Sequence, residues 1–357
     1  MSRSVTMSAV AAVAGVSITT VSHVLNGTRV VAPATRERVL QAIEQTGYQP
    51  QPTARSLAAG SNRTIGLAIT VANNPYWVDL IQGIDTEAGR AGLKLVVVDT
   101  RDDATYEHSA VANLLAHRID GLVIAPTAEW RGSTLPLLRD QGAPFVVVDR
   151  IDPQLRVDQV GAENEAAVTA VIEHLLQRGH TRIGMLGGIP GLSTSAERLR
   201  GYHLAHARSG VRVDPELIRV GDSSTPGGYA ATSHLLRLAK PPTALFSANS
   251  GMTIGALAAL QRAGVRVPDD MALAAFDDFP WADLFSPGLT TIAQPSAAIG
   301  ARAVQLLVRR MQDPFATPQT LRLPVEVMHR ESCGCVHSSS VVLQEICASD
   351  SRPLAAY

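Results

Sequence analysis

From residue 64 onward the chain alternates between short apolar runs and helical patterns, and this alternation restricts the folds that it can adopt. The runs are rich in Val, Ile, Leu and Ala, as buried strands are, and lie at residues 65–71, 93–99, 121–126, 145–149, 182–187, 243–248 and 271–277. Helical patterns lie between them, for instance at residues 80–91, 168–176 and 255–262. Strands that alternate with helices predict an α/β fold with parallel sheets and right-handed crossovers.

Polar residues stand where several of these predicted strands end. They are Asp99, Thr127, Asp149, Asn249 and Asp277. Open parallel sheets bind ligands in the crevice beyond the carboxyl ends of their strands. The sequence therefore predicts a ligand site at this edge of the sheets.

The N-terminal stretch, residues 6–26, has a different pattern, with two short helices around Gly15-Val16-Ser17. Gly15 can end the first helix in the left-handed conformation, and the Ser17 hydroxyl can cap the second. Each helix has one apolar face, which holds Val10, Val13 and Ala14 in the first and Val21, Val24 and Leu25 in the second. The opposite face of the second helix has no acidic group and carries Ile18, Thr19, Ser22, His23 and Asn26.

Two short helices at a tight angle, the second with such a face, are typical of a helix-turn-helix whose second helix enters the major groove of DNA. An ordinary helical hairpin is the alternative that this pattern alone leaves open. The charge distribution favours DNA. Residues 1–63 carry six arginines and two glutamates, a net charge of +4, whereas the whole chain has a net charge of −1.

Four motifs then occur in order: V-S-I-T-T-V-S-H-V-L-N-G (16–27), T-R-E-R-V (35–39), G-Y-Q-P (47–50) and A-R-S-L (54–57). With them the chain resembles the lactose-repressor (LacI) family of bacterial transcription regulators, and the resemblance continues to about Cys335. It implies a three-helix head, a hinge and a two-lobed body of the periplasmic-binding-protein type I with parallel sheets. The third helix of the head is expected to begin at Pro33 and to end at Gly47, with Val39, Leu40 and Ile43 facing inward.

We place the helix-turn-helix head at residues 1–49, the hinge at 50–61 and the effector-binding and dimerisation body at 62–335. The chain is expected to pass between the two lobes three times, which divides the body into lobe one (62–161 and 295–320) and lobe two (162–292 and 321–335). Residues 336–357 have no clear partner, and we expect a disordered tail there.

The hinge contains one or two helical turns at A-R-S-L-A, too few to be stable alone. The resemblance implies that they form when two subunits lie on DNA, where Leu57 wedges between base pairs in the minor groove. A plain tether, with Leu57 packed on its own body, is the alternative.

Four residues depart from the family pattern. Ala9 replaces a usual acidic residue and Ala32 a usual capping serine, whose loss costs about 1 kcal/mol, so we expect a less stable head. In the body, Ser250 stands where an aspartate is usual, and Ser223 where some relatives have an aromatic residue. The last two weaken any inference about which sugar binds.

The resemblance also implies which residues contact DNA. Ile18 and Thr19 lie at the start of the recognition helix, where side chains reach base edges, and Ile18 can make only apolar contacts there. His23 can donate or accept a hydrogen bond, and Arg29 can reach a base or a phosphate. Expected phosphate contacts are Ser17, Thr20, Ser22, Asn26 and Tyr48. In the hinge, Arg55 and Leu57 are also expected to contact DNA.

In the body, the motifs N-P-Y-W (74–77), S-A-E-R-L-R-G-Y (195–202) and A-N-S-G-M-T-I-G-A (248–256) and the stretch 276–295 also match family patterns. Carried over, they place an effector site between the lobes at Tyr76, Asp149, Arg150, Arg198, Asn249, Asp277 and Gln294. The side chains of Asp, Asn and Arg can each form two hydrogen bonds to neighbouring hydroxyl groups, and an aromatic face can cover a sugar ring. The set suits a neutral monosaccharide or small oligosaccharide, while a nucleobase, a phosphorylated sugar or another polyol stays open.

Simpler roles are open for some of these residues. Asp149 and Arg150 can pair with each other at a strand end, and Trp77 and Trp281 can serve as packing residues rather than as platforms for a ring. Arg198 and Asp277 are the strongest candidates, because they are polar groups inside well-matched motifs.

We therefore expect a ligand-responsive transcriptional regulator, a repressor of sugar-utilisation genes, which binds a palindromic operator in double-stranded DNA as a homodimer. A small molecule in the cleft, expected to be a sugar, controls the DNA affinity, and assembly into a tetramer stays open. The alternative is a sugar-binding receptor without a DNA role, against which the intact hinge and the absence of a signal-peptide pattern argue. No enzyme is expected, because no G-x-S-x-G, H-E-x-x-H or P-loop motif occurs.

We expect a cytoplasmic bacterial protein with no membrane span, since no apolar run reaches about 18 residues. The three cysteines, Cys333, Cys335 and Cys347, lie near the C-terminal end and fit a reducing compartment. Cys333-Gly334-Cys335 resembles half of a metal site, but the sequence shows no second pair that would complete four ligands. We therefore expect neither a metal nor a cofactor.

Overall fold

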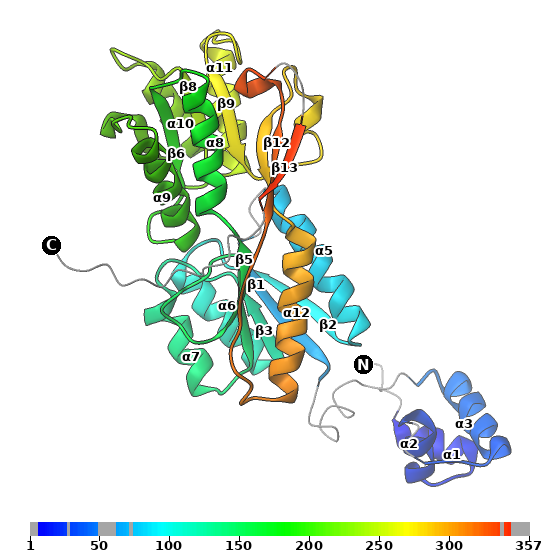
Figure 1. The fold of residues 1–357 in the computed structure, drawn as a ribbon. Coiled ribbons are helices and arrows are strands. Elements are labelled where there is room, and N and C mark those ends of the chain that lie inside the picture. Colours follow the sequence, from blue (N-terminus) through cyan, green and yellow to red (C-terminus); the bar gives the residue numbers. More distant parts are fainter. Residues whose placement is uncertain (1–5, 27–28, 49–61, 71–73, 336–338, 344–357) are drawn as a thin grey trace. The chain divides into compact units, whose positions relative to one another are not determined.

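The computed structural model describes residues 6–26, 29–48, 62–70, 74–335 and 339–343 (Figure 1). The chain divides into two compact units, Met1–Asn62 and Arg63–Tyr357. The first is helical over its described residues, and the second contains two sheets.

The first unit has the helices α1 (Met7–Ala14), α2 (Ile18–Asn26) and α3 (Pro33–Thr46). Gly15 ends α1 with a φ of 65°, and the chain bends by 103° between α1 and α2, which is within the range of helix-turn-helix motifs. The Ser17 hydroxyl accepts a hydrogen bond from the Thr20 amide at 3.1 Å and caps α2 as predicted. Gly47, with a φ of 63°, ends α3.

The core of the first unit consists of Val10, Ala11, Ala14, Val21, Val39, Ala42 and Tyr48. Two predictions about this core are wrong, because the side chains of Val13 and Leu40 are 54% and 49% exposed. Alanines take the buried places instead, Ala11 in α1 and Ala42 in α3. Small residues let helices approach closely, so the contact face turns toward the alanines and away from the larger side chains.

The first lobe of the second unit is built on a six-stranded parallel sheet with the order β11-β5-β4-β3-β1-β2. Its strands are β1 (Thr64–Ile69), β2 (Lys94–Asp99), β3 (Gly121–Ile124), β4 (Phe145–Val148), β5 (Asp158–Ala162) and β11 (Thr320–Leu323). Its helices are α5 (Pro75–Arg90), α6 (Ala104–Ala116), α7 (Thr134–Asp140) and α12 (Ser296–Gln312), with the short 3-10 helix η1 (Trp130–Gly132).

Strand residues alternate between two apolar clusters in this lobe. Ile65, Leu67 and Ile69 pack with α5 and α12, whereas Ala68 packs with α6 and α7 on the other face. Helices therefore cover both faces of the sheet, as the alternating pattern predicted.

The second lobe has a seven-stranded sheet with the order β13-β12-β10-β9-β8-β6-β7. Its strands are β6 (Ile183–Gly187), β7 (Ile218–Val220), β8 (Ala244–Ser247), β9 (Ala272–Phe276), β10 (Thr290–Ala293), β12 (Val325–His329) and β13 (Ser339–Leu343). Strands β6 to β10 are parallel, and β12 and β13 add to them antiparallel. The helices are α8 (Glu165–Gln177), α9 (Ser193–Arg208), α10 (Thr225–Leu236) and α11 (Ser250–Arg262), with the 3-10 helices η2 (Pro215–Leu217), η3 (Ala282–Leu284) and η4 (Glu331–Cys333).

The chain passes between the lobes three times, after β5, after β10 and after β11 (Figure 1). The last passage differs from the predicted boundary at 320/321. Strand β11 pairs with β5 as far as Leu323 opposite Ala162, so residues 321–323 belong to the first lobe.

The C-terminal end also differs from the prediction. Residues 339–343, expected to be disordered, form β13 and pair with all of β12, from His329 opposite Ser339 to Val325 opposite Leu343. The segment S-S-V-V-L has the β-branched residues of a strand, and it covers an edge of β12 that would otherwise stay unpaired. Among the described residues no single helix is long and apolar enough to cross a membrane. The bent pair of α1 and α2 reaches the necessary length and apolar composition only when the two helices are taken together.

Candidate functional sites

The outer face of α2 lies open in the first unit. Ile18 is 51% exposed, and Thr19 beside it is exposed as well. The Ser17 and Thr20 hydroxyls lie 2.9 Å apart, so these two residues order the start of α2. Ser22 and His23 are half-buried on the next turn, and Arg29 is exposed after the helix. An apolar residue and small hydroxyls at an exposed helix start are the groups that read base edges.

Four predicted contacts of the first unit need comment. Tyr48 is only 9% exposed and its ring belongs to the core, which leaves its hydroxyl as the group that can reach a phosphate. Asn26 is the last residue of α2, and Arg55 and Leu57 lie outside the described residues. Their DNA contacts, like those of the other residues, stay predictions.

In the second unit, one cavity of about 490 Å³ receives side chains from both lobes. All seven residues predicted for the effector site line it: Tyr76, Asp149, Arg150, Arg198, Asn249, Asp277 and Gln294. Most of them directly follow a strand, namely β4, β8, β9 or β10. The cavity therefore lies beyond the carboxyl ends of the strands, where parallel sheets bind ligands.

Asp149 and Asp277 occupy equivalent places in the two lobes, each directly after a strand. Both have left-handed backbones, with φ of 66° and 74°, a strained conformation that turns the side chain toward the cavity edge of the sheet. Asp277 accepts hydrogen bonds from Gln294 Nε2 at 2.6 Å and from the Ser250 amide at 3.2 Å. It also lies 3.4 Å from Asn74 Nδ2 of the other lobe. Burial raises the pKa of Asp149 above its usual range.

The two arginines are held by fixed partners. Arg150 pairs with Asp102 and donates to the Pro126 carbonyl at 2.9 Å, while its Nε lies 3.8 Å from Asp149. A simple pair of Arg150 with Asp149 is therefore not its main contact. Arg198 donates to Asn164 Oδ1 at 2.9 Å and to the Ala248 carbonyl at 2.6 Å.

Arg198 also stacks on an aromatic ring. Its guanidinium carbon lies 3.6 Å from the centre of the Phe276 ring. Stacking and hydrogen bonding together fix the plane of this group at the wall of the cavity.

Three buried polar atoms of the cavity make no hydrogen bond among the described residues. They are Gln294 Oε1, Arg150 Nε, which lies 3.8 Å from Asp149, and Tyr76 Oη, which faces the same carboxylate. Burial, followed by the charge of Asp149 and the contact of the phenol with that carboxylate, raises the pKa of the Tyr76 phenol well above its usual value, so the phenol is neutral and can donate. Unpaired buried polar atoms are rare in folded proteins. A polar ligand in the cavity would give these three atoms hydrogen-bond partners.

Sequence reasoning missed one wall of the cavity. Ser224 caps α10 through the Gly227 amide at 3.1 Å, and Asp222 to Pro226, around the start of that helix, line the cavity. Of these five residues, only Ser223 had been singled out from the sequence. Strand β7 before it has only three residues, too short to stand out as an apolar run. The helix-start signal Ser224-Thr225-Pro226 was present in the sequence.

The tryptophans differ in their roles. Trp77 is 6% exposed, lines the cavity and meets the Tyr76 ring edge-on at 4.9 Å, so it packs and contributes to the wall. Trp281 is 44% exposed and lines a separate hollow with Val78 and Ile254.

Both units match known families. Residues 6–51 match the model of bacterial regulatory proteins of the lacI family, and residues 172–333 match that of periplasmic binding protein-like domains. The HTH-type transcriptional repressor PurR of Aliivibrio fischeri (strain MJ11) is 34% identical over 330 residues, which are 92% of this chain and 98% of the relative. The PurR of Photobacterium profundum is 33% identical over 327 residues, with the same coverage.

Solved structures give a consistent picture. The lac repressor dimer bound to operator and the anti-inducer ONPF superposes with a TM-score of 0.83 at 29% identity, covering 93% of this chain and 99% of that one. The transcriptional regulator CelR in its cellobiose complex superposes with a TM-score of 0.70 at 31% identity, covering 92% and 99%. These relatives are transcriptional regulators, and no enzyme family is indicated.

Proposed function

The chain belongs to the lacI family of bacterial regulatory proteins, as a DNA-binding transcriptional repressor with a ligand-binding body, and we propose that a small sugar in the cleft controls its affinity for DNA. The observation that carries this proposal is the set of three buried polar atoms in the cavity, Tyr76 Oη, Gln294 Oε1 and Arg150 Nε, that lack a well-formed hydrogen bond among the described residues. Hydroxyl groups both donate and accept, so a polyol can satisfy all three.

The aromatic lining favours a sugar over a nucleobase. Tyr76 and Trp77 are the aromatic residues that line the described part of the cavity, and both lie on α5. Proteins commonly hold a nucleobase by stacking it between aromatic or apolar side chains, whereas one aromatic face together with surrounding hydrogen-bonding groups suits a sugar ring. Ser223, a small hydroxyl residue, lines the cavity from the opposite lobe. The cellobiose in the CelR complex supports the same ligand class.

The proposed mechanism is a change in lobe closure. A ligand that bridges Asp149 and Asp277 binds better to the arrangement in which both lobes reach it, and it therefore stabilises that arrangement. Such coupling is typically about 1–3 kcal/mol, or a 5- to 150-fold change in DNA affinity. The direction of the change distinguishes induction from corepression.

Ligand binding is best tested with Tyr76→Phe, which removes only the phenol hydroxyl that faces the cavity. We expect about 3- to 10-fold weaker sugar binding in calorimetry, the effect of one hydrogen bond, and no loss of stability in the ligand-free protein. Tyr106→Phe, on the exposed face of α6, is the matched control. A panel of sugars, polyols and nucleobases identifies the class, and a response to nucleobases alone would overturn the sugar proposal.

DNA binding is tested by selecting duplexes from a random pool with full-length protein at a fixed salt concentration. We expect a palindrome of about 14–20 base pairs. Ile18→Ala should relax the preference at one position of each half-site, and Leu57→Ala should weaken binding overall. Val13→Ala, an exposed apolar residue of α1, is the control. Binding that depends on salt alone, with no enriched sequence, would contradict the proposed contacts.

We place the dimer surface at the exposed apolar residues of the body. Val78, Ile254 and Trp281 line one hollow with exposures of 65%, 37% and 44%. Apolar patches of this kind mark protein interfaces. Val78→Glu should shift the protein toward monomer in sedimentation, whereas Val220→Glu, 53% exposed on β7, should not.

A further inference from the structure

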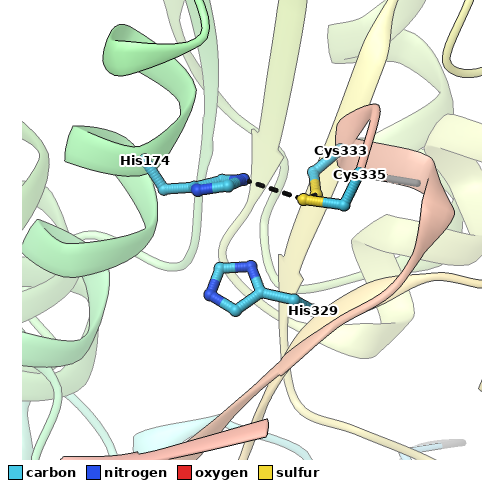
Figure 2. Close-up of side chains that lie close together, drawn as sticks. All are labelled: His174, His329, Cys333 and Cys335. Carbon is cyan, nitrogen blue, oxygen red and sulfur yellow. Dashed lines mark hydrogen bonds between the residues drawn. The ribbon is translucent and has the colours of Figure 1, made fainter. Parts of the chain in front are cut away.

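The second lobe gathers four metal-binding side chains away from the cleft (Figure 2). They are His174 in the last turn of α8, His329 at the end of β12, Cys333 in η4 and Cys335 just after it. One ligand atom from each lies within 4.8 Å of all the others. The lack of a second cysteine pair was the reason to expect no metal, and that reason is wrong because two histidines complete the set.

The distances suit a tetrahedral ion. The two sulfur atoms lie 3.2 Å apart, and Cys335 Sγ lies 3.4 Å from His174 Nε2. A zinc ion with bonds of about 2.3 Å to sulfur and 2.0 Å to nitrogen holds neighbouring ligand atoms about 3.3–3.8 Å apart, so the sulfur–nitrogen distance fits and the two sulfur atoms must move slightly apart. The imidazole centres of His174 and His329 are 4.5 Å apart, so a small approach of His329 closes the set.

The backbone brings both thiols to the same side. Gly334, between them, has a φ of 84°, a left-handed turn that residues with side chains rarely adopt. Its amide donates to the Glu331 carbonyl at 2.8 Å, and Arg178, one turn beyond His174, donates to the Gly334 carbonyl. The loop that presents the cysteines is therefore tied to α8 before any ion binds.

One histidine of the set also has a ring nitrogen without a partner in the described part of the chain. His329 Nδ1 is buried and has no hydrogen-bond partner among the described residues. Arg178, which donates to the Gly334 carbonyl, places a positive charge beside the loop that carries the two thiols.

We propose that His174, His329, Cys333 and Cys335 bind one Zn²⁺ ion in a closed structural site. Two thiolates and two imidazoles form the Cys₂His₂ set that zinc prefers, with no open position for catalysis. Binding releases the proton of each thiol to solvent and changes no oxidation state. The ion would fasten η4 and the end of β12 onto α8, and this role is independent of DNA or sugar binding.

The test uses full-length protein prepared under reducing conditions without chelators. We expect one zinc per chain by elemental analysis, and, after exchange to Co²⁺, the intense visible bands of a tetrahedral site with thiolate ligands. Cys335→Ser should lose both signals, and His329→Gln should weaken metal binding at least about 10-fold. Cys347→Ser, in the part of the chain that is not described, is the matched control and should keep them.

Stability gives a second, independent measurement. Zinc should raise the Tm of chelator-treated wild-type protein as its concentration increases, but not the Tm of Cys335→Ser. Equal metal content in wild type and Cys335→Ser would overturn the proposal. So would folded, fully reduced wild type that takes up no Co²⁺. A Cys333–Cys335 disulfide in the isolated protein, with no metal uptake after reduction, would assign the pair to redox chemistry instead.

Discussion

Substitution of Gly83 by alanine tests the packing that supports the first lobe. A Cβ atom at Gly83 would lie 2.1 Å from the backbone oxygen of Ala297 in α12, where a relaxed contact needs about 3.5 Å. Neither helix backbone can yield locally, so α5 and α12 must separate by about 1 Å or more and lose contacts beneath the sheet. We expect a loss of about 3 kcal/mol, at the upper end of typical overpacking.

The matched control lies in the same helix. Gly89, one and a half turns further along α5, has no atom within 4 Å of its would-be Cβ. Gly89→Ala should therefore stabilise the protein by about 0.5–1 kcal/mol through the lower entropy of its unfolded chain. In thermal unfolding, the Tm of Gly83→Ala should fall by about 6–12 °C and that of Gly89→Ala should rise by about 1–4 °C.

The contact is reciprocal, which gives a further check. A Cβ at Gly300 in α12 would lie 2.4 Å from the Leu80 carbonyl oxygen, so Gly300→Ala should resemble Gly83→Ala. The double variant should lose less stability than the sum of the losses in the two single variants, because helices that one added methyl group has already separated also have room for the second methyl group. Equal effects of Gly83→Ala and Gly89→Ala, or strict additivity, would refute this account of the packing.

Three further predictions concern charge and capping. Asp149→Asn should stabilise the ligand-free protein at neutral pH, because burial raises the pKa of this carboxyl in the folded state and disfavours its charged form. This gain in stability should vanish in denaturant melts below about pH 4, where the carboxyl is protonated in both the folded and the unfolded state. The same substitution should weaken sugar binding. Burial lowers the pKa of His206, so the stability of the wild-type protein should fall as the pH drops below about 6.5. His206→Gln should flatten this pH dependence, whereas His203→Gln, at an exposed residue of the same helix, should leave it unchanged. Ala32→Ser supplies the cap that α3 lacks, and amide hydrogen exchange in α3 should slow by an amount equivalent to about 1 kcal/mol.

Features that depend on neighbouring residues could be predicted from the sequence. The ends of α1 and α3 follow from Gly15 and Gly47, and the cap of α2 from Ser17. The cleft also follows, because strands that run in parallel bring their carboxyl ends together whatever the length of chain between them. Asp149 and Asp277, which are far apart in sequence, therefore line one cavity.

Features that depend on distant contacts could not. His174 reaches Cys335 across 161 residues, and nothing in the sequence around His174 marks it as a ligand. The pairing of β13 with β12 likewise depends on an open sheet edge that only the folded lobe has. Val13 and Leu40 were misplaced because hydrophobicity ranks large side chains first, whereas close helix contacts favour alanine.

Ser250, at a position where the family resemblance leads us to expect an aspartate, forms a contact between the two lobes. Its hydroxyl donates to Asn74 Oδ1 of the other lobe at 2.8 Å, and its amide donates to Asp277. The orientation of the Asn74 side chain is already fixed, because the same oxygen caps α5 through the Tyr76 amide at 3.0 Å. An aspartate at 250 would face this oxygen and the Asp277 carboxylate with no proton to donate, and relief would require the Asn74 amide to flip and release its cap. Serine therefore bridges the lobes without help from a ligand. The residues that line the cavity must then select the effector from other small molecules. Among them, Tyr76 and Gln294 carry buried polar atoms without a well-formed hydrogen bond in the described part of the chain.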